Sequence, residues 1–281
     1  MTIYLRELRA NFKSFLIWAG TMVFLIYAGM MKYSAFAKTG ESVNDLFRSL
    51  PQELLVAMGI DSGMDLSSIG AFYSIFFLYF LLLTSVHSCL LGVNIIAKEQ
   101  RDKTADFLLV KPIKRRKVVS AKVAAALTFV ILYNLVTLAT SIVAVRPLND
   151  TGMSLDGPIL RLALALLIIQ ILFLSVGLFL GAWSSKAARA SGLAAAVILG
   201  TFILKVLIDL NEDLEALEFL TPFRYFSSAD VMFGGNVDWP YIILAGVLAV
   251  AFTAGAYYFF HQRDILSEHI CMERGVPVRH K

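Results

Sequence analysis

Six apolar blocks, each long enough to cross a membrane as a helix, constrain this chain more than any other feature of its sequence. A helix needs about 20 apolar residues to cross about 30 Å of hydrocarbon. Hydrophobic residues make up 58% of the chain and charged residues only 16%, which leaves too little polar surface for a water-soluble fold. We therefore predict an all-α integral membrane protein, a single transmembrane domain over residues 1–281. Its six predicted spans cover residues 14–33, 71–96, 118–145, 159–183, 190–210 and 239–261.

The distribution of Lys and Arg predicts the orientation of these spans, because cytoplasmic loops are enriched in positive charge. If the N-terminus is cytoplasmic, 18 of the 25 Lys and Arg residues fall on the inner side, and 14 of the 21 Asp and Glu residues fall on the outer side. The opposite orientation would invert this bias. We expect a multi-pass protein of the cell membrane that has both termini in the cytoplasm and contacts membrane lipid.

Two outer loops and the N-terminal segment are too apolar to be simple connections. Residues 1–13 mix charged and apolar side chains and predict an amphipathic helix ahead of the first span. Residues 34–70 place apolar side chains at helical spacing on both sides of Pro51, which predicts a pair of short amphipathic helices on the membrane surface. Residues 211–238 are rich in aromatic side chains but interrupted, which predicts a re-entrant or interfacial element before the sixth span.

The inner loop over residues 96–122 has an ordered pattern of its own. It opens with a charged run that favours a helix, continues with apolar residues 107–110, and meets Pro112. Since proline restricts the residue before it, the helix should end near Lys111, ahead of the basic cluster 114–117. This order predicts a short helix at the cytoplasmic membrane surface. A loop that served only to orient the spans would need positive charge, but it would not need this order of charged, apolar, proline and basic residues.

The sequence contains none of the common catalytic patterns. It has no phosphate-binding loop of the form GxxxxGK[ST], no HExxH, no GxSxG and no paired carboxylates on one apolar segment. Its two cysteines form no metal-binding spacing, and its histidines are scattered at positions 87, 261, 269 and 280. We therefore expect no catalytic residue, no metal site, no cofactor, no nucleotide-binding domain and no nucleic-acid partner for this chain.

Polar residues inside the predicted spans are candidates for function, because such residues are costly in hydrocarbon. For Asn134 and Gln170 we favour hydrogen bonds between helices over a functional role. Lys205 and Asp209 lie four residues apart, so they can pair with each other or extend toward the interface. His87 is the best functional candidate. The full set comprises His87, Asn94, Asn134, Gln170, Lys205 and Asp209.

The inner loop resembles the first cytoplasmic loop of ABC-2 type transporter permeases, such as those of the bacitracin-resistance and sodium-export kind. That family shows a pattern like E-x-x-x-G-T-x-x-x-L-L-x-x-P-x-x-R followed by a lysine that opens the third span. The chain matches it from Glu99 through Arg115 and Lys122, with Lys103 in place of the glycine. The run Pro-Phe-Arg-Tyr-Phe at 222–226 and Arg-Asp-Ile at 263–265 resemble two further family elements.

This resemblance implies the membrane subunit of an ATP-driven exporter with a type V-like fold. Two separate ATPase subunits would bind ATP and Mg, and a second permease copy, identical or related, would complete a dimer. The inner-loop helix would be a coupling helix that docks on the ATPase, supported by the N-terminal helix. The coupling residues that the resemblance implies are Glu99, Arg101, Asp102, Asp106, Phe107, Leu108, Pro112 and Arg115.

The resemblance also implies a translocation pathway at the dimer interface, lined mainly by the second and fifth spans. Its candidate residues are Phe76, Tyr79, Phe80, His87 and Phe202, although aromatic side chains in spans are as often plain packing. Two alternatives from other classes are a secondary transporter and a membrane-embedded enzyme without an ATPase partner. The chain lacks the internal repeat and paired broken spans that are typical of a secondary transporter. Nothing in the spans selects a transported substrate.

Overall fold

A computed structural model describes residues 3–39, 49–57, 68–101, 115–149, 152, 154–184, 186–234 and 238–262. Within these ranges every regular element is helical. The long helices are α1 (Ile3–Thr39), α4 (Ile69–Arg101), α6 (Arg115–Val145), α7 (Asp156–Trp183), α8 (Ala187–Leu210) and α10 (Trp239–Gln262). The short elements are α3 (Gln52–Ala57), η1 (Arg146–Leu148), η2 (Glu212–Leu220), η3 (Pro222–Arg224) and α9 (Ser228–Phe233).

The six long helices of the described chain are each long and apolar enough to cross a membrane, which confirms the predicted spans. Helix α1 differs most from its predicted span, because it begins at Ile3 and runs for 37 residues. At a rise of about 1.5 Å per residue it is about 55 Å long, well beyond the hydrocarbon thickness. The amphipathic segment 3–13, which contains neither Gly nor Pro, is therefore continuous with the first span.

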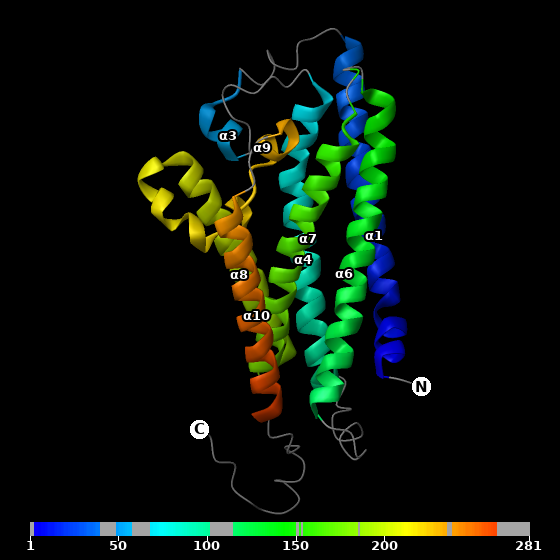
Figure 1. Cartoon of the computed structure of the whole chain (residues 1–281), viewed down its shortest axis with the longest axis vertical. Coiled ribbons are helices and arrows are strands. Elements are labelled where there is room, and N and C mark those ends of the chain that lie inside the picture. The colour runs from blue at the N-terminus through cyan, green and yellow to red at the C-terminus, as the bar shows by residue number, and fades with distance from the viewer. Residues whose placement is uncertain are drawn as a thin grey trace, which may run out of the picture.

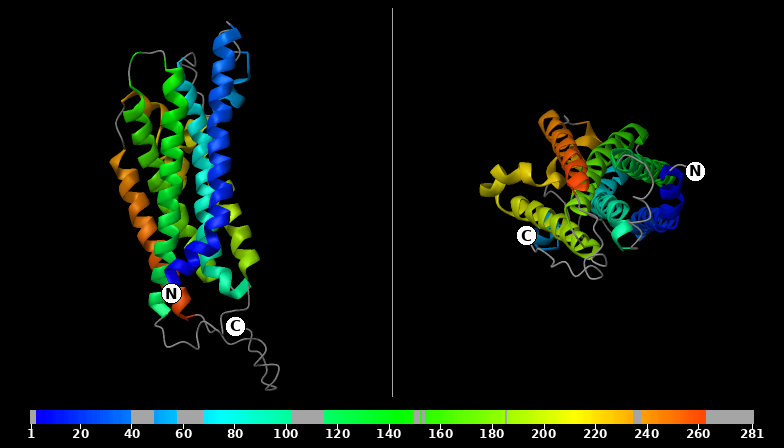
Figure 2. Two further views of the ribbon diagram at one scale, coloured as in Figure 1. Left: turned by 90° about the vertical axis from the view of Figure 1, so that its right-hand side faces the viewer. Right: turned by 90° about the horizontal axis from the view of Figure 1, so that it is seen from below.

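Helices α4 and α7 form the centre of the bundle, with α1 and α6 on one side and α8 and α10 on the other (Figures 1 and 2). In the most apolar stretch of α4, 72% of the residues are buried, and the share is the same in α7. The corresponding share is 22% in α8 and 17% in α10. In a membrane, lipid or another protein subunit must therefore cover the outer faces of α8 and α10.

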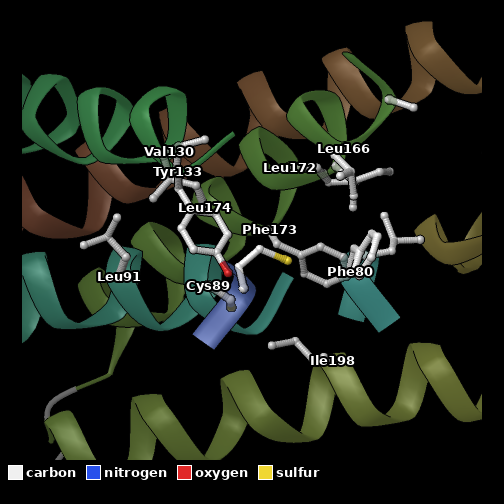
Figure 3. Packing of buried hydrophobic residues seen from close by; sticks show 14 of the residues in the cluster. Phe80, Cys89, Leu91, Val130, Tyr133, Leu166, Leu172, Phe173, Leu174 and Ile198 are labelled. Atoms are coloured by element: carbon white, nitrogen blue, oxygen red, sulfur yellow. The ribbon is translucent and has the colours of Figure 1, made fainter. Parts of the chain in front are cut away.

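Glycines allow α4 and α7 to cross in close contact. A Cβ on Gly92 of α4 would lie 2.5 Å from the carbonyl oxygen of Leu174 on α7. A Cβ on Gly177 of α7 would overlap the carbonyl oxygen of Cys89 on α4. Figure 3 shows Cys89 within the apolar core that surrounds this crossing, together with Phe173 and Leu174. Small residues at such positions let helix backbones approach in lipid, where apolar burial alone gives little net attraction.

The N-terminal end of α1 and the C-terminal end of α10 lie at the same end of the bundle, which we call the terminal end (Figure 1). Helix α4 ends there at Arg101, and α6 begins there at Arg115. The other end of the bundle carries α3 and α9 (Figure 1). The predicted helix pair of the first outer loop is described only in part, since α3 follows Pro51 but residues 40–48 lie outside the described ranges.

The segment between α8 and α10 is folded onto the bundle by its aromatic residues. Phe223 and Tyr225 are buried, and the ring of Phe223 contacts Phe173 of α7 and Phe202 of α8 at centroid distances of 5.4 and 5.6 Å. Tyr225 donates a hydrogen bond to the carbonyl oxygen of Phe219 and stacks on Tyr241. Burial raises the pKa of Tyr225 to about 12, so its hydroxyl stays a donor at neutral pH. These contacts explain why the segment is too apolar for a solvated loop, and its re-entrant placement stays a prediction.

Candidate functional site

A cluster of charged side chains joins three helices at the terminal end of the bundle. The carboxylate of Glu7 on α1 is fully buried, and Lys122 of α6 is fully buried beside it. Glu7 Oε1 lies 3.9 Å from Lys122 Nζ and 3.0 Å from Arg6 Nη2, and Glu7 Oε2 lies 3.7 Å from Lys98 Nζ of α4. Lys122 Nζ also donates a hydrogen bond to the carbonyl oxygen of Ile95 on α4. We call Arg6, Glu7, Lys98 and Lys122 the terminal charge cluster.

The terminal charge cluster binds α1 to both helices that flank residues 102–114. Lys98 precedes the end of α4 by less than one turn, and Lys122 follows the start of α6 by about two turns. A hydrogen bond of 3.0 Å between Tyr4 and Thr128 adds a second link from α1 to α6. Removing one partner of a buried ion pair leaves an uncompensated charge, which costs about 3–5 kcal/mol. The start of α1, the end of α4 and the start of α6 should therefore move as one unit.

Helix α10 contacts the start of α6 from the other side. Arg115 Nη1 donates a hydrogen bond of 2.9 Å to the carbonyl oxygen of His261, and the hydroxyls of Ser120 and Tyr257 lie 2.9 Å apart. The first turns of α6 are thus attached to α1, α4 and α10. These contacts fix the start of α6 relative to three other helices.

The predicted coupling residues are described only in part. Arg115 is the first residue of α6, and the backbone of Glu99 and Arg101 forms the last turn of α4. The predicted short helix and five of its residues, Asp102, Asp106, Phe107, Leu108 and Pro112, lie outside the described residues. Glu7 was missed by the sequence reasoning, although it is the one acidic residue within the basic segment 1–13.

His87 lies in the interior of the bundle between aromatic rings of two other helices. Its imidazole stacks on Tyr133 of α6 at 4.4 Å and contacts the ring of Trp18 of α1 at 5.5 Å, both measured between centroids. Only 3% of His87 is exposed, and its Nδ1 has no hydrogen-bond partner among the described residues. A cavity of about 70 Å³ adjoins it between α1, α4 and α6.

The sequence profile of ABC-2 family transporter proteins matches residues 1–265 of the chain. The chain belongs to the ABC-2 transporter family. A comparison with curated proteins gives no match. Members of this family are the permease components of ABC transporters, so the chain is a membrane transport component and not itself an enzyme. The family normally works with an ABC ATPase.

In the permease, three of the five predicted pathway residues lie close together on α4. Phe76, Tyr79 and Phe80 follow one another on α4 and contact each other, with centroid distances of 5.8 Å for Phe76 to Tyr79 and 6.4 Å for Phe76 to Phe80. Tyr79 is 38% exposed, whereas Phe80 is fully buried inside the protomer. Phe202 of α8 packs on Phe223 of η3. Their role in a pathway stays a prediction.

Asn134 and Gln170 form the hydrogen bonds between helices that the sequence led us to favour, and of the two alternatives for Lys205 and Asp209 the structure shows the pair. Asn134 Nδ2 of α6 donates to Gln170 Oε1 of α7 at 3.5 Å and to the carbonyl oxygen of Ala163 at 3.0 Å, so the pair binds two helices together. Lys205 Nζ and Asp209 Oδ2 lie 2.6 Å apart on α8. Arg224 of η3, which was not predicted to take part, approaches Asp209 Oδ1 to 3.3 Å.

Proposed function

We propose that this permease is the membrane subunit of an ATP-driven exporter and that it works as a dimer coupled to two separate ATPase subunits. These subunits would bind ATP and Mg²⁺, and the permease would lie in the cell membrane with both termini in the cytoplasm. The observation that carries the proposal is the terminal charge cluster, which attaches α1 to both helices flanking residues 102–114. Residues 102–114 contain most of the motif, Glu99 to Arg115, that resembles the coupling loop of the family.

The proposed mechanism requires a stiff connection between the ATPase and the bundle. Closure of the ATPase pair on ATP would displace residues 102–114, and with them the ends of α4 and α6. Because Glu7 is held by Lys98 and Lys122, α1 would follow that displacement. Bound nucleotide would then favour one of two conformations of the permease, because the contacts with the ATPase differ between the two.

Helix α8 supports the proposal of a second permease copy. Gly192, Ala196 and Gly200 lie four residues apart on an exposed face, and a Cβ on either glycine would meet no atom within 4 Å. Such spacing lets two membrane helices approach closely. We propose this face as the contact with a partner protomer, and a pathway between the two copies would lie beside it.

The test is a pull-down of the detergent-solubilised permease from its native host. We expect recovery of a soluble protein with a phosphate-binding loop, in about equal amount to the permease. Phe107→Asp should abolish this recovery, because it places a charge among the apolar residues of the coupling motif. Phe219→Asp is the matched control, since Phe219 is 50% exposed on η2, far along the chain from the coupling motif. It should leave recovery unchanged.

Two results would contradict the proposal. A permease that stays without an ATPase at native expression would favour a secondary transporter or a membrane-embedded enzyme. Equal loss of the ATPase in Phe107→Asp and Phe219→Asp would remove the coupling assignment from residues 102–114, because the effect would then not depend on the position of the charge.

A further inference from the structure

The cavity beside His87 has a partly polar lining. Four of its lining residues carry neutral polar side chains: Asn11 and Ser14 of α1 and His87 and Asn94 of α4. The others are Phe15, Trp18, Leu90, Leu91 and Phe129. The interior crossing of α4 and α7 is in contrast closed by backbone contact at Gly92 and Gly177. The contact of α1 with α4 thus contains a polar space, whereas α4 and α7 touch backbone to backbone where they cross.

The size and chemistry of the cavity fit water molecules. A cavity holds a water when it offers about 10–15 Å³ and two or more polar partners, so a polar space of this size has room for several. No charged side chain lines it among the described residues, which argues against an ion as its resident ligand. His87 Nδ1 is buried without a partner among the described residues, and water is a small ligand that can supply one.

The cavity lies about one helical turn from the terminal charge cluster on both α1 and α4. Asn11 lines the cavity and donates a hydrogen bond of 3.0 Å from Nδ2 to the carbonyl oxygen of Glu7. On α4, Asn94 of the cavity lies one turn from Lys98 of the cluster. Ser14 is exposed, and Asn11 and Asn94 are half-buried, so the polar lining reaches from the bundle interior to the surface near the terminal end.

We propose that this cavity is a water-binding site, open toward the terminal end, which hydrates the contact between α1 and α4 as far as His87. Hydrogen bonds through water exchange partners readily, whereas a dry helix contact must separate as a whole. Away from the terminal charge cluster, which holds the ends of α1 and α4 together, a hydrated contact lets α1 tilt against α4 while the close crossing of α4 and α7 stays closed. The proposal concerns this chain alone and does not require an ATPase partner.

Capture of thiols by Ag⁺ tests the proposal, because this small cation reaches a buried thiol only through water. The starting protein carries Cys271→Ser and keeps Cys89, which is fully buried on α4 and serves as the dry control. Asn94→Cys and Ser14→Cys each place a thiol at the cavity. Ile17→Cys is the matched control on α1, since Ile17 is 70% exposed but does not line the cavity. Each protein is reconstituted in lipid discs, treated with Ag⁺, unfolded, and labelled with maleimide.

We expect Asn94→Cys and Ser14→Cys to lose maleimide labelling of the added thiol, while Cys89 and Ile17→Cys keep theirs. Retained labelling at Asn94→Cys would overturn the proposal, because the cavity would then be as dry as the site of Cys89. Equal loss at Ile17→Cys would overturn it as well, since access would not depend on the cavity. If Asn94→Cys fails to elute as a folded species in size-exclusion chromatography, the comparison of Ser14→Cys with Ile17→Cys decides in the same way.

Discussion

Glu7 of α1 and Lys122 of α6, separated by more than 100 residues in the sequence, are both fully buried and face each other across 3.9 Å between Oε1 and Nζ. Lys122 also donates to the carbonyl oxygen of Ile95, so a single ammonium group contacts α1 and α4. Burial of charge is tolerated only where partners compensate it. The pair therefore makes the position of α1 depend on the position of α6.

Replacing Glu7 by glutamine should strongly destabilise the permease. Glu7→Gln leaves Lys98 and Lys122 without their carboxylate, and removing one partner of a buried ion pair costs about 3–5 kcal/mol. The measurement is the midpoint of thermal unfolding of the detergent-solubilised protein. Glu53→Gln on α3 is the control, because Glu53 is exposed, and it should leave the midpoint unchanged.

The double variant Glu7→Gln with Lys122→Met separates loss of the pair from loss of packing. Since it removes both charges of the fully buried pair, it should recover part of the stability lost in Glu7→Gln alone. A double variant that is less stable than the single one by the full cost of Lys122→Met would show that the two residues act independently.

Adding a methyl group at Gly177 should separate α4 from α7. A Cβ there overlaps the carbonyl oxygen of Cys89, and backbone cannot move aside as a flexible side chain can. Overpacking of this kind costs about 1–3 kcal/mol or more, and we expect a lower unfolding midpoint for Gly177→Ala. Gly246→Ala on α10 is the matched control, since a Cβ there meets no atom within 4 Å. Equal effects of the two substitutions would contradict the close crossing.

The sequence was sufficient to predict the six spans, because length and hydropathy alone determine whether a helix can cross a membrane. It also predicted the pair Lys205 and Asp209, which lie one turn apart on a single helix. The pairing of Glu7 with Lys122 could not be predicted in the same way. It depends on which helices of the bundle are neighbours, and a single sequence contains no signal for that when the partners lie on different spans.

The exposed small residues of α8 predict where two permease copies meet. Gly200→Leu should weaken self-association, because it places a large side chain on the face where close approach is expected. Gly20→Leu on α1 is the matched control, since a Cβ at Gly20 also meets no atom within 4 Å. Chemical cross-linking in lipid vesicles measures the dimer fraction. A dimer fraction that falls in Gly20→Leu and not in Gly200→Leu would place the interface on α1 instead.

Tyr225 should make the stability of the permease depend on pH in the alkaline range. Burial raises its pKa to about 12 in the folded chain, whereas an unfolded tyrosine ionises near about 10. Between these values the folded chain binds more protons than the unfolded chain, so the contribution of Tyr225 is complete below about pH 10 and is lost as the pH rises toward 12. Tyr225→Phe also removes the hydrogen bond to Phe219, which contributes about 1 kcal/mol.

The wild-type chain should therefore have a higher unfolding midpoint than Tyr225→Phe. This advantage should be largest at neutral pH and should shrink at alkaline pH. Thermal unfolding at about pH 8 and about pH 11, on either side of the ionisation of a free tyrosine, measures it. Tyr258→Phe is the control for loss of a hydroxyl group, because Tyr258 is 58% exposed on α10 and its substitution should change the midpoint little. An advantage that grows with pH would mean that the Tyr225 hydroxyl ionises more readily in the folded chain than in the unfolded chain, which its burial and its bond to Phe219 oppose.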